Sequence, residues 1–191
     1  MNKTLINLAK AYVGESQARN RYTSYAKVAQ KEGFEQIAEI FRLTADQEKE
    51  HASWLFKLIK ELKKDNNEPI KIEAEVPTTY GSTEANLKAA INGENYEHTK
   101  MYPEFAKVAT QEGLVQISAR LNSIAMAEKH HEERYTKILK QVQDKSVFVK
   151  GEAVWWLCRE CGYVYFGKTP PKTCPSCSHP QGFYQLLSEN Y

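Results

Sequence analysis

Long apolar runs and an excess of charge of one sign are both missing from this chain of 191 residues. Lys and Arg together number 26 against 24 Asp and Glu, which leaves a formal net charge of +2. The sequence therefore offers neither a basic stripe for nucleic acid nor an acidic interaction tail. The first ten residues mix polar and apolar types, so neither a signal peptide nor a membrane span is expected. We expect a cytoplasmic protein that binds neither nucleic acid nor membranes.

Cysteine is also scarce, and its four copies lie close together. They form two Cys-x-x-Cys pairs, Cys158 with Cys161 and Cys174 with Cys177, separated by twelve residues. In a reducing compartment this pattern favours a metal site over disulfides. Four thiolates suit tetrahedral zinc or iron. The spacing alone leaves open whether the site is a structural zinc or an iron that carries one electron.

The composition changes after Lys150, where Trp, Tyr and Phe crowd a stretch rich in Cys, Pro and Gly. A module of about 40 residues rarely folds without a disulfide or metal to hold it together. The cysteine site supplies that stabilisation. We therefore predict two domains, one over residues 1–149 and a small one over residues 150–191.

The larger domain contains an internal repeat. Residues 24–38 recur as residues 104–118 at an offset of 80, and both copies lead into Glu-x-x-His, as Glu48 with His51 and Glu128 with His131. Further upstream the offset is 79, so the second copy carries one extra residue between positions 94 and 106. An insertion of one residue inside a helix produces a π-bulge, and such bulges favour functional sites.

Apolar residues recur at three- and four-residue spacing in four segments of roughly 28 residues, each about 42 Å long as a helix. Gly33 and Gly113 are expected to end helices in the left-handed conformation. Residues 69–82 contain Pro and Gly and predict a long crossover. Four such helices with one crossover predict an all-α, ferritin-like four-helix bundle, followed by the small metal-binding β domain.

An acidic residue interrupts the apolar seam of each predicted helix, and these are Glu15, Glu48, Glu94 and Glu128. A buried carboxylate is costly unless it is compensated. One Glu from each of two helices, with Glu-x-x-His from the other two, is the pattern of ferritin-like dimetal sites. Imidazole favours iron or another transition metal over calcium and magnesium. The alternative is that these helices carry surface salt bridges, but the four positions in register on the seam argue against it.

Other polar residues lie near these positions. Glu97 has no acidic counterpart in the first copy, where Ala18 aligns with it, so an extra carboxylate makes the predicted site asymmetric. The remaining histidines, His98, His130 and His179, are more typical of solvated or hydrogen-bonded side chains than of ligands.

The chain resembles the rubrerythrin family over essentially its whole length. The motifs that carry the resemblance are Gly14–Tyr22 (GESQARNRY), Ala45–His51 (ADQEKEH), Gly93–Glu97, Met101–Pro103 and the rubredoxin-like Cys158-x-x-Cys161-Gly-Tyr with Cys174-Pro-x-Cys177. The resemblance implies two non-haem irons in the bundle and one iron in Fe(S-Cys)4 coordination. It also implies the reduction of hydrogen peroxide to water, with electrons that pass through the FeS4 centre.

The resemblance further implies a role for individual residues. The di-iron ligands would be Glu15, Glu48, His51, Glu94, Glu97, Glu128 and His131, and one iron would exchange Glu97 for His51 on reduction. Tyr22 and Tyr102 would donate hydrogen bonds near the site, although packing alone also accounts for buried tyrosines. Ser178 stands where free rubredoxins usually have Gly.

The resemblance also implies partners. These are a second copy of the chain in a head-to-tail homodimer and an external electron donor, such as rubredoxin or its reductase, that links the enzyme to NADH. Two other functions fit the same residues. One is a ferroxidase or iron-handling protein with a structural zinc at the cysteines, and the other is an oxidase that consumes dioxygen.

Overall fold

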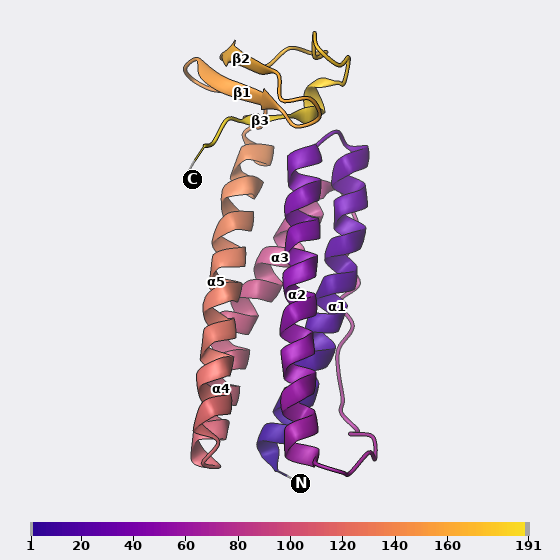
Figure 1. Ribbon diagram of the computed structural model, residues 1–191, viewed down its shortest axis with the longest axis vertical. Helices are drawn as coiled ribbons and strands as arrows, with labels where there is room; N and C mark the ends of the chain where they lie inside the picture. The colour runs from indigo at the N-terminus through magenta and orange to yellow at the C-terminus, as the bar shows by residue number, and fades with distance from the viewer. Residues whose placement is uncertain (1, 190–191) are drawn as a thin grey trace.

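The computed structural model describes residues 2–189 and consists of a helical bundle with a small β module at one end (Figure 1). The helices are α1 (Lys3–Lys31), α2 (Glu35–Lys63), α3 (Thr83–Tyr96), η1 (Glu97–Met101), α4 (Tyr102–Gln111) and α5 (Val115–Gln143). Because α3, η1 and α4 follow one another without a break, the chain forms four long rods. The predicted four-helix bundle is therefore confirmed.

The extra residue of the second repeat is absorbed in η1, a π-helical segment over Glu97–Met101. This segment lies between Glu94 and Ala106, where the change of offset predicts a bulge. Wider π-helical turns change the direction of the side chains that follow them, so η1 turns Glu97 and Met101 toward the interior, where both are buried.

One tight turn joins the two helices of each repeat. Gly33 has φ +82° and Gly113 has φ +76°, so both adopt the predicted left-handed conformation. The amide of Phe34 then donates to the carbonyl of Ala29, which accounts for one carbonyl at the end of α1. These turns make α1 antiparallel to α2, and α4 antiparallel to α5. The crossover, residues 64–82, runs along the outside of the bundle (Figure 1).

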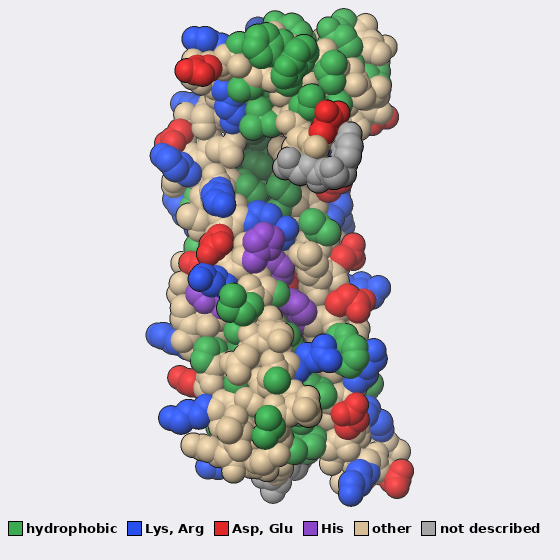
Figure 2. Space-filling model, turned by 60° about the vertical axis from the view of Figure 1, so that its left-hand side comes forward, with side chains coloured by type: hydrophobic (Ala, Val, Ile, Leu, Met, Phe, Trp, Pro, Cys, Tyr) green, Lys and Arg blue, Asp and Glu red, His purple; other side chains and the backbone are tan. Residues whose placement is uncertain are grey.

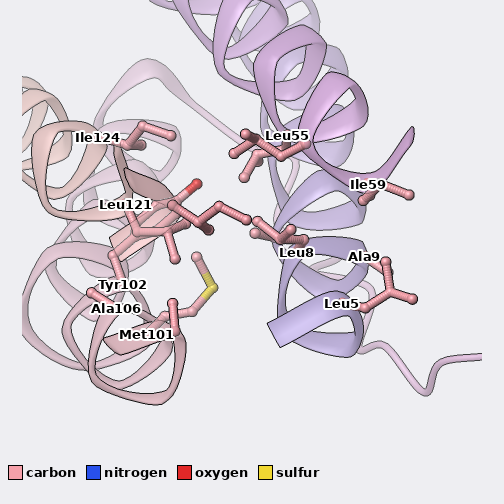
Figure 3. Packing of buried hydrophobic residues seen from close by; sticks show 14 of the residues in the cluster. Leu5, Leu8, Ala9, Leu55, Ile59, Met101, Tyr102, Ala106, Leu121 and Ile124 are labelled. Carbon is pink, nitrogen blue, oxygen red and sulfur yellow. The ribbon is translucent and has the colours of Figure 1, made fainter. Parts of the chain in front are cut away.

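The bundle core divides into two apolar clusters with a polar layer between them. The cluster near the N-terminus of α1 includes Leu8, Leu55, Tyr102 and Leu121, which approach one another from opposite helix pairs (Figure 3). The cluster at the other end is aromatic and contains Tyr22, Tyr25, Phe41 and Tyr135. The two clusters shield the polar layer from both ends of the bundle.

The β module consists of β1 (Val154–Cys158), β2 (Val164–Gly167) and β3 (Tyr184–Leu186), with the short helix η2 (Gln181–Phe183) before β3. The strands are antiparallel in the order β2-β1-β3. Since α5 ends at Gln143 and β1 begins at Val154, the boundary at 149 and 150 stays a prediction within this link.

The module rests on the end of the bundle where α2 begins (Figure 1). The guanidinium of Arg159 forms an ion pair with Glu39 of α2. Gly182 lies so close to the backbone of Gly33 that a β-carbon at this position would overlap the Gly33 carbonyl. Across residues 2–189, the helices are too polar or too short to cross a lipid bilayer.

Candidate metal centres

Four glutamates and two histidines meet midway along the bundle. Glu15 comes from α1, Glu48 and His51 from α2, Glu94 from α3, and Glu128 and His131 from α5. Each glutamate lies on the buried seam of its helix and has no exposed surface. This burial excludes the alternative of surface salt bridges. Histidine side chains reach the surface at mid-height of the bundle (Figure 2).

These side chains form two overlapping groups whose ligand atoms all lie within 4.8 Å of one another. One group contains Glu15, Glu48, His51 and Glu128, and the other contains Glu48, Glu94, Glu128 and His131. Glu48 and Glu128 belong to both groups. A carboxylate shared in this way can bridge two ions, so the arrangement suits a pair of metals.

The hydrogen bonding of these atoms supports the same interpretation. Among the described residues, at least one carboxylate oxygen on each of the four glutamates is buried with no hydrogen-bond partner other than the Nδ1 atoms of the two histidines. Buried acceptors in such excess are costly unless a cation compensates them. Carboxylate oxygens with imidazole nitrogens fit iron well.

In the protein without metal, protons substitute for the missing positive charge. Burial raises the pKa of Glu15 and of Glu94 to about 8, and the neighbouring Glu48 carboxylate adds to the effect. Burial lowers the pKa of His131, but hydrogen bonds to Glu128 and Glu48 outweigh it and raise that pKa to about 11. The pKa of His51 is raised for the same reason. Metal binding must displace these protons.

Each histidine presents its Nδ1 atom to the carboxylates. For His51, Nδ1 lies 2.8 Å from Glu128 and 3.2 Å from Glu48. For His131 the corresponding distances are 2.8 Å and 3.2 Å. The two rings therefore face the bridging carboxylates from opposite sides, at 6.1 Å between ring centroids.

The two predicted tyrosines each donate to a carboxylate of the site. Tyr22 Oη donates to Glu94 Oε1 at 2.5 Å, and Tyr102 Oη donates to Glu15 Oε1. Burial, together with the nearby carboxylates, raises the pKa of both hydroxyls well above the ordinary value. Both tyrosines therefore keep their protons. Their hydrogen bonds hold Glu15 and Glu94, the two glutamates that each belong to only one ligand group.

Glu97 lies beside the site but in neither ligand group. It is buried in η1, and burial followed by the charge of Glu15 raises the pKa of its carboxyl well above the ordinary value. The structure thus brings His51, and not Glu97, within ligand distance of the bridging carboxylates. The exchange of these two ligands stays a prediction.

The three other histidines lie outside both ligand groups. His98 is within hydrogen-bonding distance of Glu132, at 2.5 Å between Nε2 and Oε2. The ring of His179 packs on Phe183 at 4.5 Å between centroids. His130 is exposed on α5.

Gln47 and Arg134 form hydrogen bonds next to the site, and the sequence did not predict their contacts. Gln47 Oε1 lies 3.0 Å from His131 Nε2, and the Arg134 guanidinium donates to Gln47 Oε1 and to Thr44 Oγ1 at 3.3 Å and 2.8 Å. Gln47 belongs to the Ala45–His51 motif, but helix position alone does not place it beside a histidine of α5.

The four cysteines form the second centre, in the β module. The Sγ atoms pair at 3.7 Å, Cys158 with Cys177 and Cys161 with Cys174, and all four lie within 4.8 Å. Burial raises the pKa of the Cys174 thiol, but the backbone N–H groups of residues 176 and 177 help to lower it to about 6. A thiolate at neutral pH is the form that binds metal.

Each Cys-x-x-Cys turn is followed by a residue in the left-handed conformation. These residues are Gly162, with φ +76°, and Ser178, with φ +62°. The Ser178 amide donates to the Cys174 carbonyl, as the Gly162 amide does to the Cys158 carbonyl. The replacement of Gly by Ser noted in the sequence therefore keeps the turn, at the cost of a strained backbone.

Comparisons with known proteins agree with both centres. The family model described as rubrerythrin matches residues 7–139, and the model described as the rubrerythrin rubredoxin-like domain matches residues 156–185. A putative rubrerythrin of Methanocaldococcus jannaschii is 57% identical, with 100% of this chain and 96% of that protein covered. A rubrerythrin of Nitratidesulfovibrio vulgaris is 42% identical, with 100% and 97% covered.

Solved structures show the same architecture. The fully reduced, all-ferrous structure of nigerythrin has a TM-score of 0.65 at 32% identity, with 96% of this chain and 86% of that chain covered. A bacterioferritin from Desulfovibrio desulfuricans shares the bundle fold, with a TM-score of 0.63 at 20% identity over 74% of this chain and 81% of that chain. Together with the carboxylate–histidine groups of the bundle and the four cysteines of the module, these matches assign a di-iron site to the bundle and a rubredoxin-like site to the module.

Proposed function

Because the chain belongs to the rubrerythrin family, we propose that it is a peroxidase that defends the cytoplasm against oxidative stress. Hydrogen peroxide takes up two electrons and two protons, its O–O bond breaks, and two water molecules leave. One observation carries the proposal: a single chain combines a buried carboxylate–histidine site that suits two metals with a four-cysteine rubredoxin-like site. An iron-handling protein would use the four cysteines only to hold the small module together, whereas a peroxidase would also use them to carry electrons.

The residues of the bundle have separate tasks in this reaction. When bound, the two ferrous irons supply the electrons and the positive charge that stabilises the separating oxygen atoms. Glu48 and Glu128 belong to both ligand groups and would hold both ions, while Glu15 with His51 and Glu94 with His131 would each hold one. Burial, with the charge of Glu15 next, raises the pKa of the Glu97 carboxyl and so favours its protonated form, which would let Glu97 supply one of the protons that water requires.

The electrons have to travel from the module to the bundle. The module contacts its own bundle at the beginning of α2, and thirteen residues, about 20 Å of helix, separate Glu35 from Glu48. Electron transfer slows steeply with distance. We therefore propose a head-to-tail homodimer, in which the FeS4 centre of one chain serves the di-iron site of the other. Rubredoxin or its reductase, with electrons from NADH, would reduce the oxidised FeS4 centre again.

The proposal is tested by reducing the iron-loaded protein without oxygen and mixing it with stoichiometric hydrogen peroxide. The absorption of the oxidised FeS4 centre is followed by stopped flow, with a parallel experiment that uses dioxygen. We expect the colour to return rapidly, and much faster with peroxide than with dioxygen. A faster response to dioxygen would instead indicate an oxidase.

Iron and zinc analysis of the same sample tests the iron-handling alternative. Two irons in the bundle and one at the cysteines are expected for each chain. Zinc at the cysteines, no FeS4 colour and an iron content that rises well beyond three per chain would contradict the peroxidase and favour iron handling.

A further inference from the structure

The interface between α2 and α5, called the α2–α5 seam below, is loosely packed. Helix α1 packs along the length of α2, and α5 packs along α3 and α4, whereas α2 and α5 make only sparse backbone contact. Both Glu-x-x-His motifs face each other across this seam. The seam is therefore the side on which the metal site has the least backbone around it.

Two arginines of α5 cross the seam, one on each side of the metal site along the bundle axis. Arg134 reaches Thr44 and Gln47 of α2 through hydrogen bonds. Arg120 places its guanidinium over the ring of Trp54, with 4.1 Å between Cζ and the ring centroid. The position of His51 along α2 is between these two bridges.

A small pocket opens at this place. It has a volume of about 180 Å³ and is lined by His51, Trp54, Arg120, Ser123 and Ile124. The side chain of His51 is 17% exposed, against 3% for His131, so the metal site approaches the solvent at His51. Two larger pockets, near the crossover, have linings that include none of the di-iron ligands among the described residues.

Trp54 is held in place at the mouth of this pocket. Two cations lie over its ring, Arg120 on α5 and Lys57 on the next turn of α2, at 4.1 Å and 4.2 Å from the ring centroid. Cations stacked on an indole ring in this way restrain its rotation. Trp54 is 38% exposed, so its ring lies partly in solvent at this pocket.

We propose that this pocket is the route by which peroxide reaches the di-iron site, and that Trp54, held by Arg120, limits the size of the molecules admitted. The inference rests on the proposed peroxidase function. The pocket is smaller than the roughly 300–1,000 Å³ typical of sites for drug-sized ligands. It has room for hydrogen peroxide, and a bulky organic hydroperoxide has to displace the Trp54 ring.

Organic hydroperoxides test access because their chemistry is the same. A hydroperoxide ROOH takes up two electrons and two protons, its O–O bond breaks, and ROH and water leave. The experiment compares kcat/KM for cumene hydroperoxide with kcat/KM for hydrogen peroxide in the iron-loaded protein and in Trp54→Ala. We expect this ratio to rise about tenfold or more in Trp54→Ala, since a pocket discriminates by size through steric exclusion. Arg120→Gln removes one of the two cations over the ring and should raise the ratio as well.

Phe56→Ala is the matched control. Phe56 lies two residues from Trp54 on α2, is 50% exposed and lines other pockets. The ratio in this variant should equal that of the unaltered protein. A ratio in Trp54→Ala that also stays unchanged would overturn the proposed route, and no change in Arg120→Gln would overturn the role of the stacked cation.

A second measurement does not depend on peroxidase activity. The rate at which azide binds to the oxidised, iron-loaded protein, followed by absorbance, should increase severalfold in Trp54→Ala and remain constant in Phe56→Ala. If no protein reduces any hydroperoxide but Trp54→Ala still accelerates azide binding, the peroxidase proposal fails and the access route stands. Equal azide rates in all three proteins would contradict the route.

Discussion

His131 Nε2 and Gln47 Oε1 are 3.0 Å apart, and Arg134 determines which of the two atoms carries the hydrogen. The guanidinium of Arg134 can only donate, and it donates to the same Gln47 oxygen. That oxygen is therefore the amide carbonyl, which accepts a second hydrogen bond from His131 Nε2–H. The lone pair of the neutral ring then lies on Nδ1, which faces Glu48, Glu94 and Glu128. The hydrogen bond to Gln47 thus selects the tautomer of His131 whose Nδ1 atom can bind metal.

Replacing Gln47 by Leu should weaken metal binding at the His131 side of the site. The change removes the acceptor that selects this form of the ring, and losses of such outer partners cost about 10–100-fold in metal affinity or activity. Anaerobic titration of the metal-free protein with ferrous iron measures the affinity. Gln36→Leu, on the same helix and outside the ligand groups, is the control. Equal affinities for the two variants would contradict the role of Gln47.

The hydroxyls of Tyr22 and Tyr102 should matter for turnover. Tyr22→Phe and Tyr102→Phe each leave a buried carboxylate oxygen without its donor, and we expect kcat to fall about tenfold or more in each, because the position of the ligand is lost. Steady-state peroxidase assays measure this. Tyr25→Phe removes a hydroxyl from the same helix as Tyr22, but that hydroxyl donates to the Thr79 carbonyl in the crossover. Its kcat should remain unchanged, and an equal loss in all three variants would indicate a general effect of packing.

The metal-free protein should lose stability as the pH rises. Glu15 and Glu94 have pKa values of about 8 in the folded chain against an ordinary 4.5, so the folded state binds their protons more tightly than the unfolded state does. The free energy of unfolding therefore decreases as the pH rises from about 4.5 to about 8. The raised pKa of His131, about 11 against 6.5, acts in the same direction above pH 6.5. Urea unfolding of the metal-free protein should therefore give a lower midpoint at about pH 8 than at about pH 5.

Ferrous iron should reverse this trend, because it replaces the protons that the site holds. The increase in the urea midpoint on adding iron should be larger at the higher pH. A midpoint that is constant or rises with pH in the metal-free protein would show that the buried carboxyls are not protonated in the folded state.

Mixed dimers should reveal whether electrons cross between chains. Cys174→Ser removes the FeS4 centre, and Glu128→Ala removes a bridging carboxylate of the di-iron site. Each homodimer should be inactive with an external electron donor. A heterodimer of the two variants has one FeS4 centre opposite one intact di-iron site, so it should recover a large part of the activity of one site. An inactive heterodimer, shown by mass spectrometry to have formed with its metals, would indicate transfer within one chain.

Much of the fold was predictable from the sequence, because helix periodicity assigns each side chain to a face without knowledge of its neighbours. The seams placed Glu15 and Glu128 in the interior, and the change of repeat offset predicted the π-helix that contains Glu97. The relation between Gln47 and His131 was not predictable in this way. These residues are 84 positions apart, and their contact depends on the distance and rotation between α2 and α5.

The sequence by itself determined the four-helix architecture, the positions of the buried glutamates and histidines, and the grouping of the cysteines. These follow from local rules of spacing, which act within one helix or one turn. Only the tertiary structure decided that His51 and not Glu97 reaches the bridging carboxylates, and that Arg134 and Arg120 cross the seam on either side of the site. Such contacts arise from the packing of separate helices, whose relative positions no local spacing specifies.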